Sequence, residues 1–108
     1  MLYRSDALHA LTASDLERFQ TELRISDIVD LRSTFELESE GRGLLASSPI
    51  AFHHLPLFDG SMNASEQETA NALTLGDRYI GLLEMAREPI ARVIEALARA
   101  EAGAVYHC

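Results

Sequence analysis

The sequence contains a single cysteine, Cys108, among its 108 residues. One cysteine excludes an internal disulfide, and it also excludes a zinc site built from several cysteines. No apolar run approaches the roughly 20 residues that a membrane helix needs. The opening MLYRSDALHALT carries Arg, Asp and His among its leucines, so it does not have the apolar stretch of a signal peptide. The sequence therefore predicts a cytoplasmic protein without a membrane span.

Positive charge is also scarce, because 9 Lys and Arg residues stand against 17 Asp and Glu residues. The resulting formal net charge of −8 argues against a nucleic-acid-binding protein, which needs clustered basic residues. It leaves room for a phosphorylated substrate, since a small pocket lined by backbone N–H groups is locally positive even in an acidic protein. The hydrophobic fraction of 47% and the chain length fit one ordinary globular domain.

The N-terminal half predicts a helix, a strand and a second short helix. Thr12 and Asp15 have the spacing of a capping box, and periodic apolar residues follow them. The adjacent apolar residues within 28–31 favour a strand that is buried on both faces. Ser33 and Glu36 repeat the capping-box spacing and predict a short helical turn.

The middle of the chain predicts a strand, an irregular excursion and a helix. The strand is expected over 50–57, with its pairing limited near the end by Pro56. Residues 61–77 are polar, rich in small residues and poorly periodic, which indicates an irregular segment with some helix. A helix is expected over 77–86.

The C-terminal part predicts one more helix and a final strand. Pro89 suits the first position of a helix, and Gly103 is placed to end it as the C′ residue. Residues 104–108 then form a buried strand. The helix carries an expected core stripe of Ile90, Val93, Ile94 and Leu97.

This alternation of strands and helices predicts an α/β fold with a parallel-sheet core and flanking helices. In such sheets ligands bind at the carboxyl ends of the strands. Asp59 follows one expected strand and Cys108 ends another. Two reactive side chains at strand ends mark this edge as the candidate site.

Four segments of the sequence resemble, in order and spacing, the bacterial atypical protein-tyrosine/serine phosphatase family. They are LYRSDALHALTASDLERF, DIVDLRSTFE, HHLPLFD and VYHC. The resemblance implies a phosphotyrosine-phosphatase-like fold, in which members continue from His-Cys through five residues to an arginine in a phosphate-binding loop. Residues 1–108 are then expected to be the N-terminal part of a single phosphatase domain, ending at the nucleophile and incomplete at the C-terminus. By themselves they are expected to be inactive.

The resemblance also implies roles for four residues. Cys108 is the expected nucleophile, forming a phosphocysteine intermediate, and Asp59 is the expected general acid. From the residues alone, the favoured interpretation of Asp59 is an ordinary turn aspartate, because aspartate before glycine is common in turns. Arg32 is expected either to shape the substrate site or to form a structural salt bridge, and Arg4 has the same two interpretations. His107 is expected to support the site by hydrogen bonding to the backbone.

The expected substrate is a phosphorylated protein, with phosphotyrosine first and phosphoserine, phosphothreonine or phosphoinositide as alternatives. No cofactor and no metal are expected, because His53 and His54 are adjacent on a strand and point to opposite faces. Glu36, Glu38 and Glu40 are interpreted as a solvated acidic segment. A non-catalytic phosphate-binding module remains an alternative function, and a rhodanese-like or arsenate-reducing domain is a third.

Overall fold

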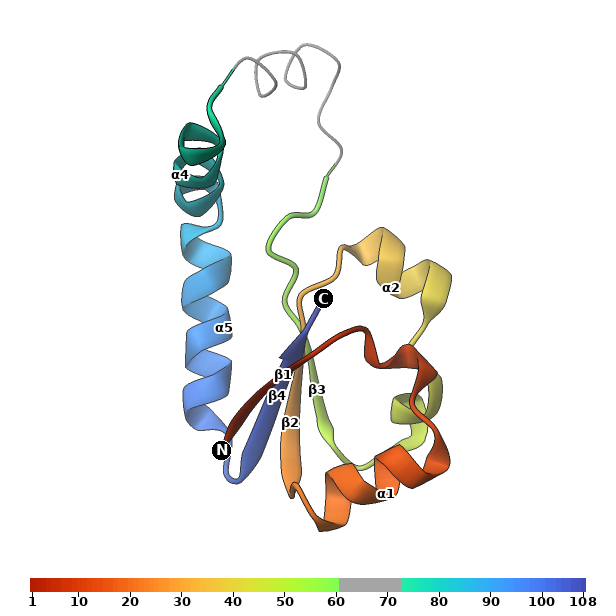
Figure 1. Cartoon of the computed structure of the whole chain (residues 1–108). Coiled ribbons are helices and arrows are strands. Elements are labelled where there is room, and N and C mark those ends of the chain that lie inside the picture. Colours follow the sequence, from red (N-terminus) through yellow and green to blue (C-terminus); the bar gives the residue numbers. More distant parts are fainter. Residues whose placement is uncertain (61–72) are drawn as a thin grey trace.

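The computed structural model describes residues 1–60 and 73–108, so part of the expected excursion over 61–77 lies outside the described residues. Four strands form one sheet in the order β1-β4-β2-β3, and all neighbouring pairs are parallel. The predicted α/β fold with a parallel-sheet core is therefore confirmed (Figure 1). The strands are β1 (Leu2–Ser5), β2 (Ile25–Asp30), β3 (Ala51–His54) and β4 (Gly103–His107).

Helical elements cover the sheet on both sides (Figure 1). One side carries α1 together with two short 3-10 turns, and α5 lies on the other side. The helix α4 continues the line of α5 beyond the end of the sheet. The bounds are η1 (Leu8–Ala10), α1 (Ala13–Thr21), α2 (Thr34–Glu40), η2 (Gly43–Ser47), α4 (Leu75–Met85) and α5 (Arg87–Arg99). No helix in the described parts of the chain is long and apolar enough to cross a membrane.

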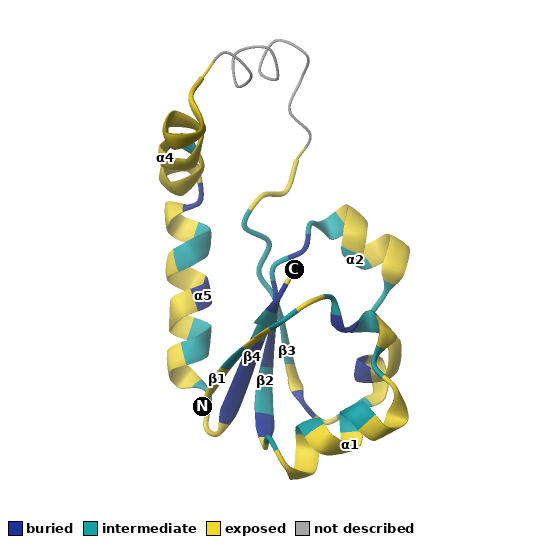
Figure 2. Cartoon of the chain, in the orientation of Figure 1, coloured by how far each residue is buried: buried dark blue, intermediate teal, exposed yellow. Residues whose placement is uncertain are grey.

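The core lies between the sheet and the side that carries α1. Side chains from β2 and β4 meet residues of the two 3-10 turns there, and Figure 2 shows the buried residues concentrated along these inner strands. On the other face, Val29 of β2 is fully buried and Val93 is the buried residue of α5. The main cluster consists of Leu8, Ile25, Ile28, Leu45, Ile50 and Val105.

Both predicted capping boxes are confirmed. The Thr12 hydroxyl accepts the Asp15 N–H at 3.2 Å, while the Asp15 carboxylate accepts the Thr12 N–H at 3.0 Å. The Ser33 hydroxyl accepts the Glu36 N–H at 3.3 Å, and the Glu36 carboxylate accepts the Ser33 N–H at 2.9 Å. These contacts satisfy backbone donors that the first helical turn leaves free.

Two strands differ from the sequence-based expectation. The segment Leu2–Ser5 forms β1, which was not predicted, and it pairs along its length with β4. The strand expected over 50–57 is shorter, because β3 ends at His54. Pro56 has no N–H to donate to a ladder, so regular pairing cannot continue through it.

The helix α5 begins and ends differently from the prediction. It starts at Arg87 rather than at Pro89, and it ends at Arg99 with Ala100 as its cap residue. Gly103 is therefore not a C′ residue but the first residue of β4. A Cβ atom on Gly103 would lie 2.8 Å from the Leu23 carbonyl oxygen, so this tight approach between chain segments requires glycine.

The buried face of α5 also differs in part from the prediction. Of the residues expected in the core stripe, Val93 is buried as predicted, whereas Ile94 has 61% of its surface exposed. The break between α4 and α5 falls at Ala86. Pro89 explains the break, because it has no N–H for the Met85 carbonyl and its ring disfavours a straight helix at that carbonyl.

Candidate active site

Cys108 directly follows β4, an inner strand that pairs with both β1 and β2. The pairing continues to the last residue of the strand, because the Leu31 N–H donates to the His107 carbonyl at 2.9 Å. The thiol of Cys108 is exposed. The fold thus presents this thiol at the carboxyl edge of the sheet, where parallel α/β sheets bind ligands.

A cavity of about 460 Å³ opens around this thiol. Arg4 of β1 lies opposite Tyr106 of β4 in the register, so the two side chains are on the same face of the sheet and border the cavity together. Arg4 is the cationic group of the lining. The residues that line the cavity are Arg4, Ser5, Asp6, Leu31, Tyr106, His107 and Cys108.

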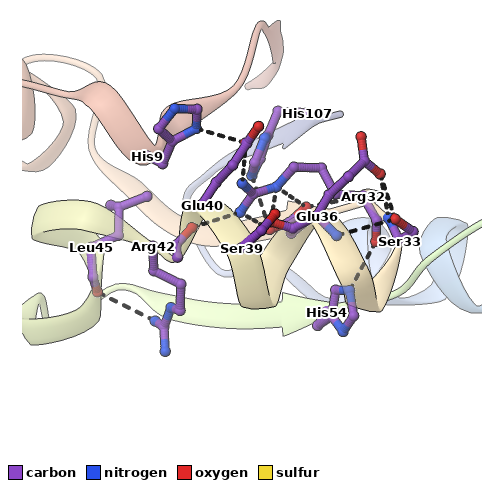
Figure 3. A network of polar contacts seen from close by, with 12 residues as sticks. His9, Arg32, Ser33, Glu36, Ser39, Glu40, Arg42, Leu45, His54 and His107 are labelled. Atoms are coloured by element: carbon purple, nitrogen blue, oxygen red, sulfur yellow. Dashed lines mark hydrogen bonds and ion pairs between the residues drawn. The ribbon is translucent and has the colours of Figure 1, made fainter.

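Arg32 lies next to this edge but is buried, with 3% of its surface exposed. Its Nε donates to both oxygens of Asp30 at 3.0 and 3.1 Å, and a terminal nitrogen donates to Asp30 Oδ2 at 2.7 Å (Figure 3). The same terminal nitrogen donates to the Gly41 carbonyl at 3.0 Å, and the other donates to Glu40 at 3.1 Å. Because every guanidinium nitrogen already has a protein acceptor, the geometry favours the structural interpretation of Arg32.

Asp30, at the end of β2, is the buried centre of this network, with none of its surface exposed. Burial acts to raise the pKa of its carboxyl, but hydrogen bonds from the Arg32 side chain and backbone outweigh burial and hold the pKa below 3.8. The carboxylate is therefore ionised at neutral pH. Sequence reasoning missed Asp30, although its position two residues before Arg32 in DLRS was a signal for a local ion pair.

Glu40 is exposed, as expected for a solvated acidic segment, and it also takes part in this network. Its carboxylate pairs with the buried Arg32 and lies 3.2 Å from His9 Nδ1 without hydrogen-bond geometry (Figure 3). Glu36 remains an exposed capping residue. The acidic segment thus supplies one side of the network that surrounds Arg32.

His107 is the buried residue that directly precedes the thiol, with 2% of its surface exposed. Its Nε2 lies 3.6 Å from Asp30 Oδ2, and neither ring nitrogen has a hydrogen-bond partner among the described residues. Burial lowers the pKa of the imidazole below 6.5, although the Asp30 carboxylate opposes this. The ring is therefore neutral at pH 7.

Asp59 lies beyond the end of β3 and is exposed. Its carboxylate accepts the Thr34 N–H at 3.0 Å and the Thr34 hydroxyl at 2.6 Å. These hydrogen bonds, the hydroxyl first, lower the pKa of Asp59 below 3.8. Asp59 is not among the described residues that line the cavity, so the structure does not bring it together with Cys108. A general acid must be protonated, which this contact disfavours.

The two adjacent histidines contact different partners. His53 Nε2 lies 2.8 Å from Asp27 Oδ1, and His54 Nε2 lies 2.9 Å from the Arg32 carbonyl oxygen. Within the described residues, no group of three or more His, Cys, Asp or Glu side chains is arranged to hold a metal ion.

The sequence that forms this site matches a known protein family. A family model with the description "Tyrosine phosphatase family" matches residues 1–108. No curated protein matches the chain.

Proposed function

This chain belongs to the tyrosine phosphatase family, and we propose on that basis that it hydrolyses phosphate monoesters of proteins with Cys108 as the nucleophile. The observation that carries the proposal is the placement of the chain's one thiol. Cys108 directly follows an inner parallel strand and lies in the lining of a cavity of about 460 Å³. A cysteine so placed is accessible to a substrate at the edge where this fold binds ligands.

The reaction proceeds in two steps. The Cys108 thiolate attacks phosphorus, so the S–P bond forms while the P–O bond to the leaving group breaks. In the second step the oxygen of water attacks phosphorus and the S–P bond breaks, which releases inorganic phosphate and restores the thiolate. Asp59 donates a proton to the leaving oxygen in the first step and accepts the proton of water in the second. To act in this way, the Asp59 carboxylate must first break its hydrogen bonds with Thr34.

The substrate is a phosphorylated protein, with phosphotyrosine first. Phosphoserine, phosphothreonine and phosphoinositide are the alternatives, because all carry the same phosphate monoester. Arg4 supports an anionic substrate, since its guanidinium is the cationic group in the cavity lining and guanidinium binds phosphate oxygens in pairs. His107 in the cavity lining and Arg32 next to it act as supporting residues.

Hydrolysis of p-nitrophenyl phosphate by the protein from its intact gene tests the proposal. We expect turnover that Cys108→Ser abolishes and that Asp59→Asn lowers by roughly 10²–10⁴-fold. We expect none from residues 1–108 by themselves, because the resemblance assigns the arginine and the backbone N–H groups of the phosphate loop to positions after Cys108.

A rate that survives Cys108→Ser would refute the proposal. The alternative, a non-catalytic phosphate-binding module of the same fold, predicts a different result. Such a module binds a phosphotyrosine peptide without turnover, and Asp59→Asn leaves that binding unchanged.

A further inference from the structure

His107 has an unmet requirement for hydrogen bonding. A neutral imidazole has one N–H donor and one acceptor nitrogen, and both nitrogens of His107 are buried without a partner among the described residues. A buried donor left unpaired is unusual and destabilising. Asp30 Oδ2 lies 3.6 Å from Nε2, which is about half an ångström beyond an N–H···O hydrogen bond.

Asp30 is fixed by its hydrogen bonds, whereas the imidazole nitrogens of His107 have no partner among the described residues. The carboxylate is fixed by the guanidinium and the backbone N–H of Arg32. Asp30 and His107 are direct register partners on β2 and β4, so their side chains lie on the same face of the sheet. A shortening of the Nε2–Oδ2 distance by about half an ångström would make this contact an N–H···O hydrogen bond.

We propose that Asp30 is a positioning residue that acts on Cys108 through the His107 ring. In this arrangement Nε2 carries the ring proton and donates it to Asp30, which fixes the tautomer. Nδ1 is then the acceptor, and covalent geometry places it near the backbone that joins His107 to Cys108. Asp30 thereby fixes the direction in which the chain leaves β4 and presents the thiol.

Other charged groups around the ring agree with this assignment. Arg32 and His9 both lower the pKa of His107, because a positive charge on the imidazole is unfavourable near them. Asp6, at the end of β1, raises it, as Asp30 does. Glu40 pairs with the outer nitrogen of Arg32 and does not touch the ring. The ring therefore stays neutral and serves as a donor to Asp30 rather than as a second cation.

The first test is the tautomer of His107, measured from its ring ¹⁵N chemical shifts in the protein from its intact gene. We expect the proton on Nε2 at pH 7 in the wild type. We expect loss of this preference in D30L/R32M, which replaces the buried ion pair with apolar side chains and leaves no buried charge unpaired, because Glu40, the other partner of Arg32, is exposed. Glu40→Gln is the matched control and leaves the tautomer unchanged. A wild-type ring protonated on Nδ1 overturns the proposal, and that measurement needs no variant to fold.

The second test uses Cys108, the one cysteine within residues 1–108, whose alkylation by iodoacetamide is followed by mass spectrometry of the peptide that contains it. D30L/R32M and His107→Phe are each expected to change the alkylation rate and its pH profile. If Asp30 acts through His107, D30L/R32M has no further effect in the His107→Phe background. Effects that multiply to within about twofold show independent action and overturn the proposal.

The inference rests on the proposed function in one respect, which is the role of Cys108 as the nucleophile. Neither readout involves phosphate hydrolysis. An enzyme that fails to hydrolyse p-nitrophenyl phosphate but shows the expected tautomer and coupling refutes the proposed function and leaves the positioning role of Asp30 intact.

Discussion

At the scale of single residues, Arg32 organises the carboxyl edge of the sheet. Its guanidinium joins Asp30 at the end of β2 to Glu40 at the end of α2 and to the Gly41 carbonyl. Removal of one member of a buried ion pair leaves the other charge without compensation, whereas replacement of both by apolar side chains is often tolerated. The stability of this edge therefore depends on the pair rather than on either residue.

Arg32→Met is expected to lower the free energy of unfolding by about 3–5 kcal/mol. D30L/R32M is expected to cost much less, because it leaves no buried charge unpaired and the remaining Glu40 carboxylate is exposed. Arg18→Met is the control, since Arg18 forms an exposed ion pair with Glu22 on α1 that is worth about 0–1 kcal/mol. Urea denaturation of the protein from its intact gene measures all three. An Arg32→Met protein as stable as Arg18→Met contradicts the structural role.

Thr34 is expected to control the protonation of Asp59. The folded-state pKa of Asp59 is depressed, so the contact stabilises the fold above pH 3.8 and is lost as the pH falls through the folded value. Thr34→Val removes the hydroxyl donor and keeps the backbone N–H, so the pKa of Asp59 should rise toward its ordinary value. Carboxyl NMR titration measures this change.

Thr21→Val is the matched control for that titration. The Thr21 hydroxyl donates to the Glu17 carbonyl on α1, where no carboxylate depends on it. The Asp59 titration should not change in this variant. An equal shift in both variants would show that the hydroxyl of Thr34 has no specific role.

The identities of the candidate site residues could be predicted from short motifs, but their partners could not. Cys108, His107, Asp59 and Arg32 stand in segments that resemble a known family. The burial of Asp30 depends on the packing of neighbouring strands, which periodicity does not reveal. The contact of Asp59 with Thr34 joins positions 25 apart in the chain, so local spacing gives no sign of it.

At the scale of secondary-structure elements, replacement by alanine should change the stability of the protein in opposite directions at Gly103 of β4 and at Gly81 of α4. A Cβ on Gly103 would meet backbone oxygens of Leu23 and Arg24 at 2.8 and 3.1 Å, whereas nothing lies within 4 Å of a Cβ on Gly81. We expect Gly103→Ala to destabilise the protein and Gly81→Ala to stabilise it by up to about 1 kcal/mol through helix propensity. Thermal denaturation distinguishes the two. A Gly103→Ala protein of unchanged stability would show that the backbone moves aside without strain.

Elements with local signals were predictable and those that depend on pairing were not. The starts of α1 and α2 followed from capping boxes contained within four residues, as Thr12 and Ser33 show. The strand β1 carries no comparable local signal, because Leu2–Ser5 is short and gains its order from pairing with β4. Gly103 was predicted to be a C′ residue, but it is the first residue of β4, where its close approach to Leu23 requires glycine.

At the scale of the whole molecule, α4 is largely uncovered (Figure 2). The radius of gyration is 15.9 Å, above the roughly 13 Å of a compact domain of about 100 residues. Several large apolar side chains of α4 are exposed, including Leu83 at 60% and Met85 at 74%. Contiguous exposed apolar surface of this kind favours association.

Residues 1–108 expressed alone are therefore expected to aggregate or to be partly molten. Leu83→Glu combined with Met85→Glu should reduce light scattering without loss of helical circular dichroism. Ile28→Glu, at a buried core position, is the control and should abolish the fold. A sharp, cooperative thermal transition from an unmodified monomer would argue against this expectation.

The strand order has a consequence for how the protein is made. Among the described strands, β1 pairs with β4 alone, and β4 is synthesised after the other three. At a synthesis rate of about 5–20 residues per second, β1 waits roughly 5–20 s for its partner. Cys108 directly follows β4. The cavity around its thiol therefore forms only after β4 has paired with β1 and β2. A nascent chain therefore has no assembled site while its fold is incomplete.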